Sequence, residues 1–278
     1  MLAVPSRRAL TTLAIAASLA LAAGCGSDDD GGGGEPRTVA IKLSGSGRDP
    51  RYTVPKSVPG GVVRLEFTND ATGEHGAQLV RVDAGHSARD GLQAAGEWAE
   101  GGKSLPSWVH TAGGVGTTPS GTTHSATQEL PPGQYAVVDI DTNARAFFEV
   151  TAAEGEAELP GTDARIDELE YRFSATGLEA GRNPVLIENK GDEPHFTEAL
   201  RIKEGKTIAD VRRFVREDKG DPPVEGGPNS TAVADGGFRQ VVELNLKKGD
   251  YALLCFVPDR KGGPPHAVKG MVSQATVE

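Results

Sequence analysis

The segment Asn69 to Asp90, NDATGEHGAQLVRVDAGHSARD, has a parallel in the segment Asn189 to Asp210, NKGDEPHFTEALRIKEGKTIAD. In both segments an Asn ends an apolar strand, and a polar turn follows that contains a single His, His75 or His195. A short apolar strand and a helical segment complete each copy. The copies lie roughly 120 residues apart, and a repeat of that size is a duplicated domain and not a solenoid unit.

The two copies match again further along the chain, where Tyr135-x-x-x-Asp139 in the first becomes Tyr251-x-x-x-Cys255 in the second. Within each copy, short runs rich in Val, Leu and Phe alternate with Gly, Pro, Asn and Asp turns, and one helical stretch interrupts them. This spacing predicts an all-β fold of two tandem Greek-key β-sandwich domains, each with one helical insertion. The predicted strands include Thr38–Leu43, Val62–Phe67, Gln78–Val82, Phe147–Val150, Leu169–Ser174, Val185–Glu188, Ala199–Ile202, Val241–Leu246 and Tyr251–Phe256.

The helical segment of the second copy has a recognisable start. Thr207 and Asp210 form the pattern of a capping box, in which two side chains satisfy the free N–H groups of the first helical turn. Linker composition near residues 151–162 separates the copies. We therefore expect one domain over residues 37–153 and a second over residues 163–278.

The first 24 residues have the order of a secretory signal: Arg7 and Arg8, an apolar stretch from Leu10 to Leu21, and then small residues. The apolar stretch is too short to span a bilayer as a mature helix. The ending Leu-Ala-Ala-Gly-Cys25 resembles a bacterial lipobox. That resemblance implies a lipid on Cys25, which would hold the chain at the extracytoplasmic face of the cell membrane. Residues 25–36, rich in Gly and Asp, are expected to be a flexible tether.

Composition narrows the choice of partners. The 278 residues include 29 basic and 39 acidic side chains, for a formal net charge of −10. An acidic chain without a basic cluster argues against binding to nucleic acid and against electrostatic attraction to anionic lipid. The expected partners are the membrane, through the lipid, and a redox protein.

Cysteine usage is the most informative part of the composition. The chain has two cysteines, and the lipid accounts for Cys25. Cys255 therefore has no partner for an internal disulfide, although the expected compartment is oxidising. It is either a small buried apolar residue or a group with a chemical role.

A set of potential metal ligands surrounds Cys255 in the second copy. Cys255 ends one predicted strand, and Met271 begins the last one, so the loop between them brings Cys255, His266 and Met271 to one end of the sandwich. His195, in an earlier turn, can approach the same point. A thiolate, two imidazoles and a thioether are the ligands of a blue-copper site, in which the thioether is the weak axial ligand.

These residues resemble the cupredoxin family, whose members carry a type 1 copper with the order Tyr-x-x-x-Cys…His-x-x-x-x-Met. Tyr251 and Cys255 keep the first spacing, and His266 and Met271 keep the second. The resemblance covers most of residues 166–278, and more loosely the first copy. It implies one copper ion, held by His195, Cys255, His266 and Met271, that passes single electrons.

The loop between the ligands looks more like that of copper nitrite reductases, because ten residues separate Cys255 from His266. Those enzymes have a His directly before the Cys, and Leu254 stands there in this chain, so nitrite reduction is not implied. The loop residues Asp259, Arg260 and Lys261 are charged, and we expect them at the surface.

The first copy lacks the ligand set. Asp139 stands where the second copy has Cys255, and neither His266 nor Met271 has an equivalent, so we expect no copper there. His86, His110 and His124 share no spacing and are assigned no metal. The sequence thus favours an extracytoplasmic lipoprotein with one copper domain for electron transfer or copper holding, and not an enzyme. The alternative is a metal-free β-sandwich lipoprotein that acts as a binding module in the envelope.

Overall fold

The computed structural model describes residues 34–45, 49–142, 144–227 and 229–278, and residues 33–278 form one compact unit. The predicted signal segment, Cys25 and most of the tether lie outside the described residues. Within the described part, no helix is long and apolar enough to span a membrane.

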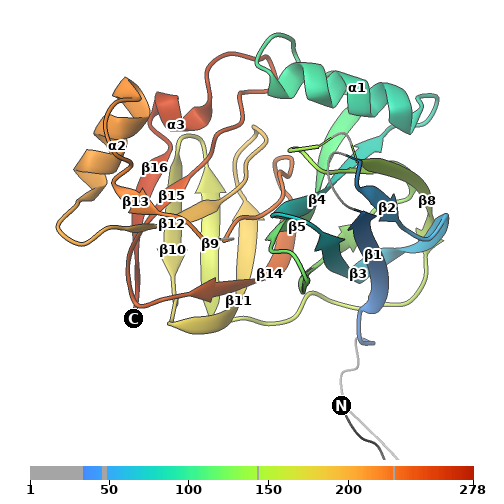
Figure 1. The fold of residues 1–278 in the computed structure, drawn as a ribbon. Coiled ribbons are helices and arrows are strands. Elements are labelled where there is room, and N and C mark those ends of the chain that lie inside the picture. Colours follow the sequence, from blue (N-terminus) through green and yellow to red (C-terminus); the bar gives the residue numbers. More distant parts are fainter. Residues whose placement is uncertain (1–33, 46–48, 143, 228) are drawn as a thin grey trace, which may run out of the picture. The chain divides into compact units, whose positions relative to one another are not determined.

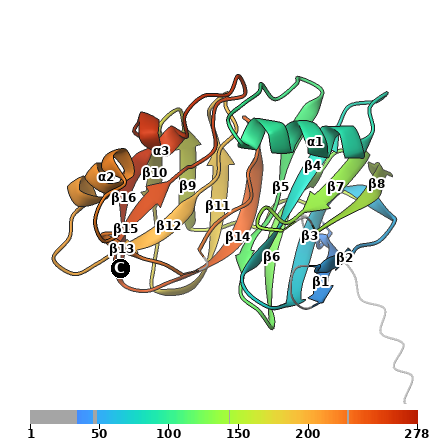
Figure 2. The same ribbon diagram turned by 45° about the horizontal axis from the view of Figure 1, so that its top comes forward.

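The first half of the described chain is a sandwich of two sheets with helix α1 (Ala88–Ala99) across one face, as Figures 1 and 2 show. One sheet has the order β2-β1-β3-β6, and the other has β8-β7-β4-β5, joined to the first through the long strand β3. Strands β1 and β3 run parallel, and most of the other pairs are antiparallel. The strands are β1 (Arg37–Gly45), β2 (Arg51–Thr53), β3 (Ser57–Ala71), β4 (His75–Val82), β5 (Val109–Thr118), β6 (Thr122–Leu130), β7 (Gly133–Val138) and β8 (Arg145–Ala153).

The second half repeats this arrangement after the extended segment 154–163. Its sheets have the orders β10-β9-β11-β14 and β13-β12-β15-β16, and β9 runs parallel to β11 as β1 does to β3. Helix α2 (Ile208–Glu217) corresponds to α1, and a single turn, α3 (His266–Lys269), precedes the last strand. The strands are β9 (Ala164–Leu169), β10 (Arg172–Thr176), β11 (Gly181–Asn189), β12 (Glu198–Ile202), β13 (Val224–Glu225), β14 (Arg239–Leu246), β15 (Gly249–Leu254) and β16 (Val272–Val277). The predicted fold class is confirmed.

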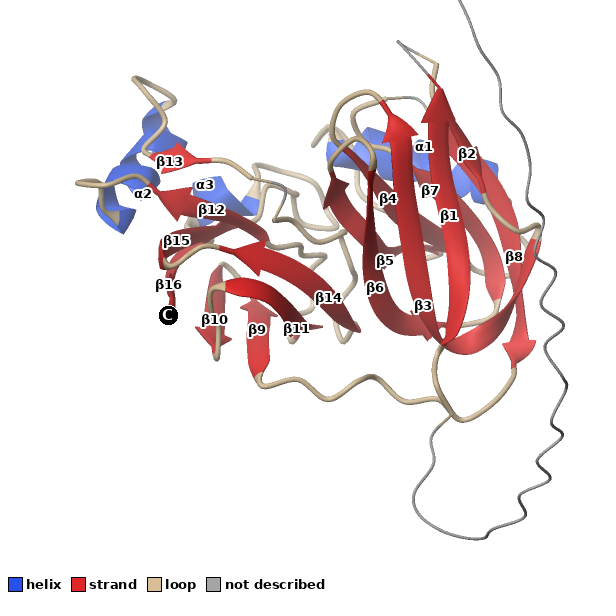
Figure 3. Cartoon of the chain, turned by 60° about the horizontal axis from the view of Figure 1, so that its bottom comes forward, coloured by secondary structure: helices blue, strands red, loops and turns tan. Residues whose placement is uncertain are grey.

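The halves share a continuous sheet, because β14 of the second half pairs antiparallel with β6 of the first (Figure 3). Strand β5 also packs directly against the segment 230–235. A Cβ atom on Gly116 would lie 1.9 Å from the carbonyl oxygen of Ser230, so only glycine permits this approach. The two halves are therefore parts of one folded unit.

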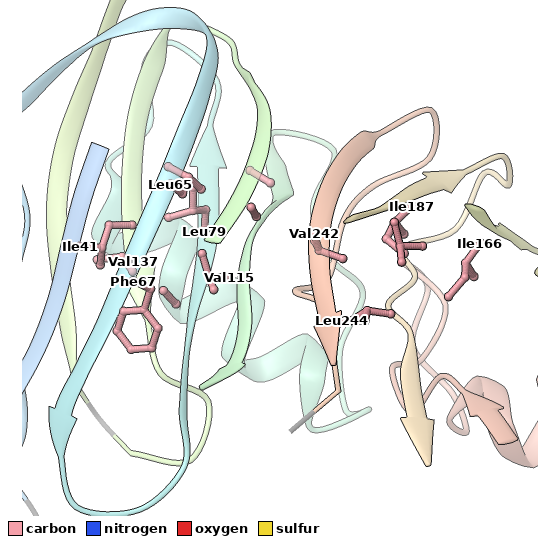
Figure 4. Close-up of a cluster of buried hydrophobic side chains, with 14 of the residues drawn as sticks. Ile41, Leu65, Phe67, Leu79, Val115, Val137, Ile166, Ile187, Val242 and Leu244 are labelled. Atoms are coloured by element: carbon pink, nitrogen blue, oxygen red, sulfur yellow. The ribbon is translucent and has the colours of Figure 1, made fainter. Parts of the chain in front are cut away.

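Alternating apolar side chains fill the space between the sheets. On β1, Val39, Ile41 and Leu43 point inward while their neighbours are exposed, which is the period-two pattern of a half-buried strand. Buried groups from both halves, such as Phe67 and Ile187, form a core on either side of the β6–β14 contact (Figure 4). The burial of this apolar surface is the main force that holds the sheets together.

The helices begin as their sequences predict. Thr207 accepts a hydrogen bond from the backbone N–H of Asp210, and the Asp210 carboxylate accepts one from the backbone of Thr207, so the capping box of α2 is confirmed. Ser87 makes the first of these bonds in α1. One predicted strand is wrong: Leu169–Ser174 is a tight hairpin, in which Glu170 and Tyr171 form the turn between β9 and β10. Tyr171 has φ of 57°, a backbone conformation that ends a strand.

One buried asparagine in each half shapes the turn before the repeated histidine. Asn69 donates to the carbonyl groups of Gly73 (2.9 Å) and Thr118 (2.8 Å) and accepts from the N–H of Ala71. Asn189 makes the same three bonds, to the carbonyls of Glu193 (2.8 Å) and Ala234 (3.0 Å) and from the N–H of Gly191. The repeated Asn-x5-His spacing thus reflects a shared turn, in which one side chain replaces missing backbone partners.

We expect Asn189→Ala and Asn69→Ala each to lower the free energy of unfolding by about 3 kcal/mol. Each substitution leaves buried backbone N–H and C=O groups without a hydrogen-bond partner. Urea denaturation measures the change. Asn245→Ala, at an exposed site on β14, is the control and should change stability by less than about 0.5 kcal/mol. A loss of the same small size for Asn189→Ala would contradict the role given to this side chain.

Candidate metal centre

Three buried side chains from different parts of the second half meet at one end of its sandwich. His195 lies in the turn before β12 and is held by a two-way backbone bridge with Ala234. Cys255 directly follows β15, and His266 is the first residue of α3. All three side chains are fully buried. Among the described residues they form the one group of His, Cys, Asp and Glu side chains arranged to hold a metal ion.

The ligand atoms face one another at distances that suit a metal. Nδ1 of His195 is 3.0 Å from Nδ1 of His266, and the Cys255 sulfur is 3.8 Å and 3.5 Å from these nitrogens. A circle through the three atoms has a radius of about 2.0 Å, which equals a typical metal–imidazole distance and is slightly below the about 2.3 Å of a metal–thiolate bond. The three atoms therefore outline a trigonal plane around a single point.

The fourth predicted ligand, Met271, is fully buried and belongs to the same apolar core as Cys255. The N–H of Met271 donates to the carbonyl of His266 (2.9 Å), and the N–H of Gly270 donates to that of Ala267 (3.1 Å). This pair of bonds is a Schellman motif, with Gly270 in the left-handed region at φ 112°. The motif sets His266 and Met271 at the two ends of one turn. Strand β16 begins at Val272, one residue later than predicted.

An aspartate fixes the ring of His266. Its Nε2 atom bonds the carboxylate of Asp259 at 2.9 Å, which leaves Nδ1 directed at Cys255. The same carboxylate accepts a hydrogen bond from Tyr171 (3.1 Å) and pairs with Lys269. A carboxylate behind a histidine sets the tautomer and the ring orientation of a metal ligand.

His195 has a different outer environment. Its Nε2 atom is buried and has no hydrogen-bond partner among the described residues. Glu170 is the acidic group nearest to it, with a carboxylate oxygen 4.0 Å away. Because Nε2 has no hydrogen-bond partner among the described residues, the backbone bridge of His195 to Ala234 and the packing of the turn hold the outer side of this imidazole.

Burial keeps the metal-free cluster uncharged. It raises the pKa of the Cys255 thiol to about 12, against the opposing effect of hydrogen bonds from the backbone of Phe196 and Val257. Burial, and then the neighbouring His266, lower the pKa of His195 to about 4. Burial also lowers the pKa of His266, although Asp259 acts in the opposite direction. A bound cation would therefore have to displace the thiol proton.

The charged loop residues are not all at the surface, and this expectation is wrong in part. Lys261 is exposed, but the side chains of Asp259 and Arg260 are only 22% and 25% exposed. The Arg260 guanidinium bonds Asp235 (2.8 Å) and the carbonyl groups of Pro106 and Val109. Partners of opposite charge make this partial burial possible. The loop is therefore attached to the body of the protein.

The first half shows what the same corner becomes without a thiol. Asp139 directly follows β7, as Cys255 follows β15, and its carboxylate bonds Nδ1 of His75 at 3.0 Å. Its other oxygen accepts from the N–H of Gly76 (3.1 Å). A direct contact between acid and imidazole thus occupies the place of the trigonal plane.

The other histidines have structural neighbours. His110 lies between Asp83 (3.0 Å) and Asp235 (3.1 Å). His86 stacks on Trp108 with a ring separation of 4.0 Å. Burial lowers the pKa of His124.

Sequence reasoning missed two acidic residues beside the site, Glu168 and Asp259. Glu168 lies on β9, is 1% exposed and accepts a hydrogen bond from Thr197 (2.7 Å). It occupies an inward position in the alternating pattern of β9, where the equivalent residue of β1 is Leu43. A single acid on the buried face of a strand was the signal that could have revealed it.

The chain matches no family model and no curated protein. Among solved structures it is similar to reduced auracyanin from the photosynthetic bacterium Roseiflexus castenholzii, with 19% identity, 42% of this chain and 99% of that chain covered, and a TM-score of 0.31. Auracyanin B has 20% identity, coverage of 42% and 91%, and a TM-score of 0.30. A copper-containing nitrite reductase from Thermus scotoductus has 13% identity, coverage of 88% and 62%, and a TM-score of 0.23. Similarities with TM-scores this low support no conclusion about the function of this chain.

We expect the stability of the metal-free protein to depend on pH through Glu168. Burial raises the pKa of this carboxyl from 4.5 to about 7, because the charged form is poorly solvated in the core. A raised carboxyl pKa adds stability below the unfolded value, and this contribution is lost as the pH rises through about 7. The shift corresponds to a loss on the order of 3 kcal/mol between pH 4.5 and pH 8.

Glu168→Gln removes this dependence and keeps an acceptor for Thr197. Urea denaturation from pH 4.5 to pH 8 gives the unfolding free energy of the variant and of the wild type. The variant should become more stable relative to the wild type as the pH rises. Taking the difference cancels the opposite trend of His195 and His266, whose lowered pKa values add stability as the pH rises. A constant difference over this range would show that Glu168 titrates normally.

Proposed function

We propose that this chain binds one copper ion through Nδ1 of His195, the sulfur of Cys255 and Nδ1 of His266, with the thioether of Met271 as the weak axial ligand. The observation that carries the proposal is the trigonal arrangement of the three atoms, whose common circle has a radius of about 2.0 Å. The donor set of two imidazoles and one thiolate is the one that selects copper for electron transfer.

The surroundings of the site support a role in passing single electrons. Copper bound there supplies a one-electron couple. The protein residues hold their positions without it, because Asp259 orients His266, the Schellman motif links His266 to Met271, and the Asn189 turn places His195. A frame that is already in place limits the rearrangement between two oxidation states. Full burial of the three side chains also keeps water from the plane of the ligands.

The proposed location is the extracytoplasmic face of the cell membrane. It rests on the sequence pattern alone: the signal-like residues 1–24, the lipobox-like Cys25 and the Gly- and Asp-rich tether. A lipid on Cys25 would keep the copper domain near membrane-bound redox partners. Among the described residues one group of side chains is arranged to hold a metal ion. We therefore propose an electron carrier or copper-holding protein and not an enzyme.

A copper titration of residues 33–278, the compact unit, tests the proposal by visible absorption. We expect an intense thiolate-to-copper band that saturates at one equivalent and disappears in Cys255→Ser. His195→Asn should weaken or abolish the band, whereas His75→Asn, the matched change in the first half, should leave it intact. A colourless protein that takes up no stoichiometric copper in either oxidation state would refute the proposal and favour a metal-free binding module.

The axial position can be tested separately by measuring the reduction potential. Met271→Gln should lower the potential, because a harder oxygen donor favours the oxidised ion, and Met271→Leu should raise it, because the thioether donor is lost. Each tenfold change in relative affinity for the two oxidation states corresponds to about 59 mV. Potentials equal to the wild-type value in both variants would exclude Met271 as a ligand.

A further inference from the structure

We infer that the first half of the chain holds the metal loop of the second half, with Trp98 as a positioning residue for His266. This inference rests on the proposed function and gives the half without ligands a defined part in it. The metal loop is the segment 256–265 between Cys255 and His266. The part of the first half that contacts it is the segment 98–109, from the end of α1 to the start of β5, and we call it the brace. Figure 2 shows the loop beside α1.

The central contact links Trp98 to the metal ligand in two steps. Trp98 is 2% exposed, and its indole N–H donates to the carbonyl oxygen of Asp259 at 2.7 Å. The carboxylate of the same Asp259 bonds Nε2 of His266 at 2.9 Å. Trp98 therefore fixes the backbone of the residue whose side chain fixes the imidazole. A shift of Asp259 would rotate the ring and move Nδ1 away from Cys255.

Four further hydrogen bonds attach the next loop residues to the brace. The N–H of Leu105 donates to the carbonyl of Arg260 at 2.6 Å. In the reverse direction, the Arg260 guanidinium donates to the carbonyl groups of Pro106 (3.1 Å) and Val109 (2.7 Å). The Ser104 hydroxyl contacts the carbonyl of Lys261 at 3.3 Å. The loop thus exchanges hydrogen bonds with the brace in both directions, and every acceptor is a backbone carbonyl oxygen.

The packing between loop and brace is close as well as polar. A Cβ atom on Gly262 would lie 3.2 Å from the carbonyl oxygen of Lys103 and 3.4 Å from that of Gly101. A Cβ atom on Gly101 would lie 3.3 Å from the carbonyl of Gly263. Two backbone segments that approach this closely leave little room for the loop to move toward the first half.

A loop of ten residues between two ligands needs such an attachment, because every residue of flexible backbone loses conformational entropy when it is ordered. Within the second half, Glu193 accepts from the backbone N–H of Arg260, and Val257 accepts from that of His266. The brace adds contacts to the middle of the loop, at Asp259, Arg260 and Lys261. A loop that is held before copper binds would release the ion slowly and present the same ligand geometry in both oxidation states.

The test compares Trp98→Phe with Trp108→Phe in the full chain. Trp108 lies within the brace and stacks on His86. Among the described residues its indole N–H donates no hydrogen bond, so it is a matched control. We expect Trp98→Phe to release copper to a chelator about 10-fold faster than the wild type, the lower end of the range for loss of an outer-sphere partner. The Cu(II) resonance spectrum and the reduction potential should also change, which a loss of stability alone would not produce. Trp108→Phe should match the wild type in all three.

Amide hydrogen exchange of the metal-free protein separates this inference from the proposed function. Trp98→Phe should speed exchange at Gly262 and His266, whose N–H groups close the loop, relative to Trp108→Phe. Equal exchange, or equal copper release and spectra where copper binds, would overturn the inference even if copper binding is confirmed. If the wild type binds no copper, the proposed function fails and exchange alone decides the inference. Arg260→Gln, which removes two contacts with the brace from the loop side, replaces Trp98→Phe if that variant does not fold.

Discussion

The candidate site depends on the placement of three donor atoms in one corner of a sandwich that excludes water. Burial makes the thiol of Cys255 hard to ionise and makes the imidazoles of His195 and His266 hard to protonate. Without a cation these groups have little attraction for one another, so the surrounding fold must supply the force that holds them together. That force comes from the core between the sheets and from a few buried hydrogen bonds at the ends of the strands. The centre is thus a product of the frame and not the reason that the frame forms.

The two halves show how little of the frame has to change for the site to be lost. The strand order, the buried asparagine and the histidine turn are the same in both. What differs is the residue after β7 or β15 and the loop that follows it, which leads to His266 and Met271 only in the second half. Asp139 contacts His75 directly and satisfies it, whereas Cys255 is a poor hydrogen-bond partner and leaves space between sulfur and nitrogen. The residue at the end of this strand, together with the loop that leads to His266 and Met271 in the second half, therefore separates a closed polar contact from a candidate metal site.

The contact between the halves gives the first half a physical role. The shared sheet between β6 and β14 and the close approach at Gly116 fix the two sandwiches in one unit. The end of α1 is then in position to bond the metal loop through Trp98. The second half holds this loop through Glu193 and Tyr171, and the first half adds bonds to its middle at Asp259, Arg260 and Lys261.

The sequence by itself determined the duplication, many of the strands and turns, and the residue types of the candidate ligands, but not the hairpin turn at Glu170 and Tyr171. These features follow from local patterns, such as the period of two on β1 or the one-turn spacing of His266 and Met271. Only the tertiary structure decided that Asp259 faces His266 and that Arg260 and Trp98 join the loop to the first half. Trp98 and Asp259 are 161 residues apart, and a contact over that distance leaves no periodicity in the chain. Charged loop residues are expected in water, because their burial is costly until a partner appears, and only the folded chain brings that partner to them.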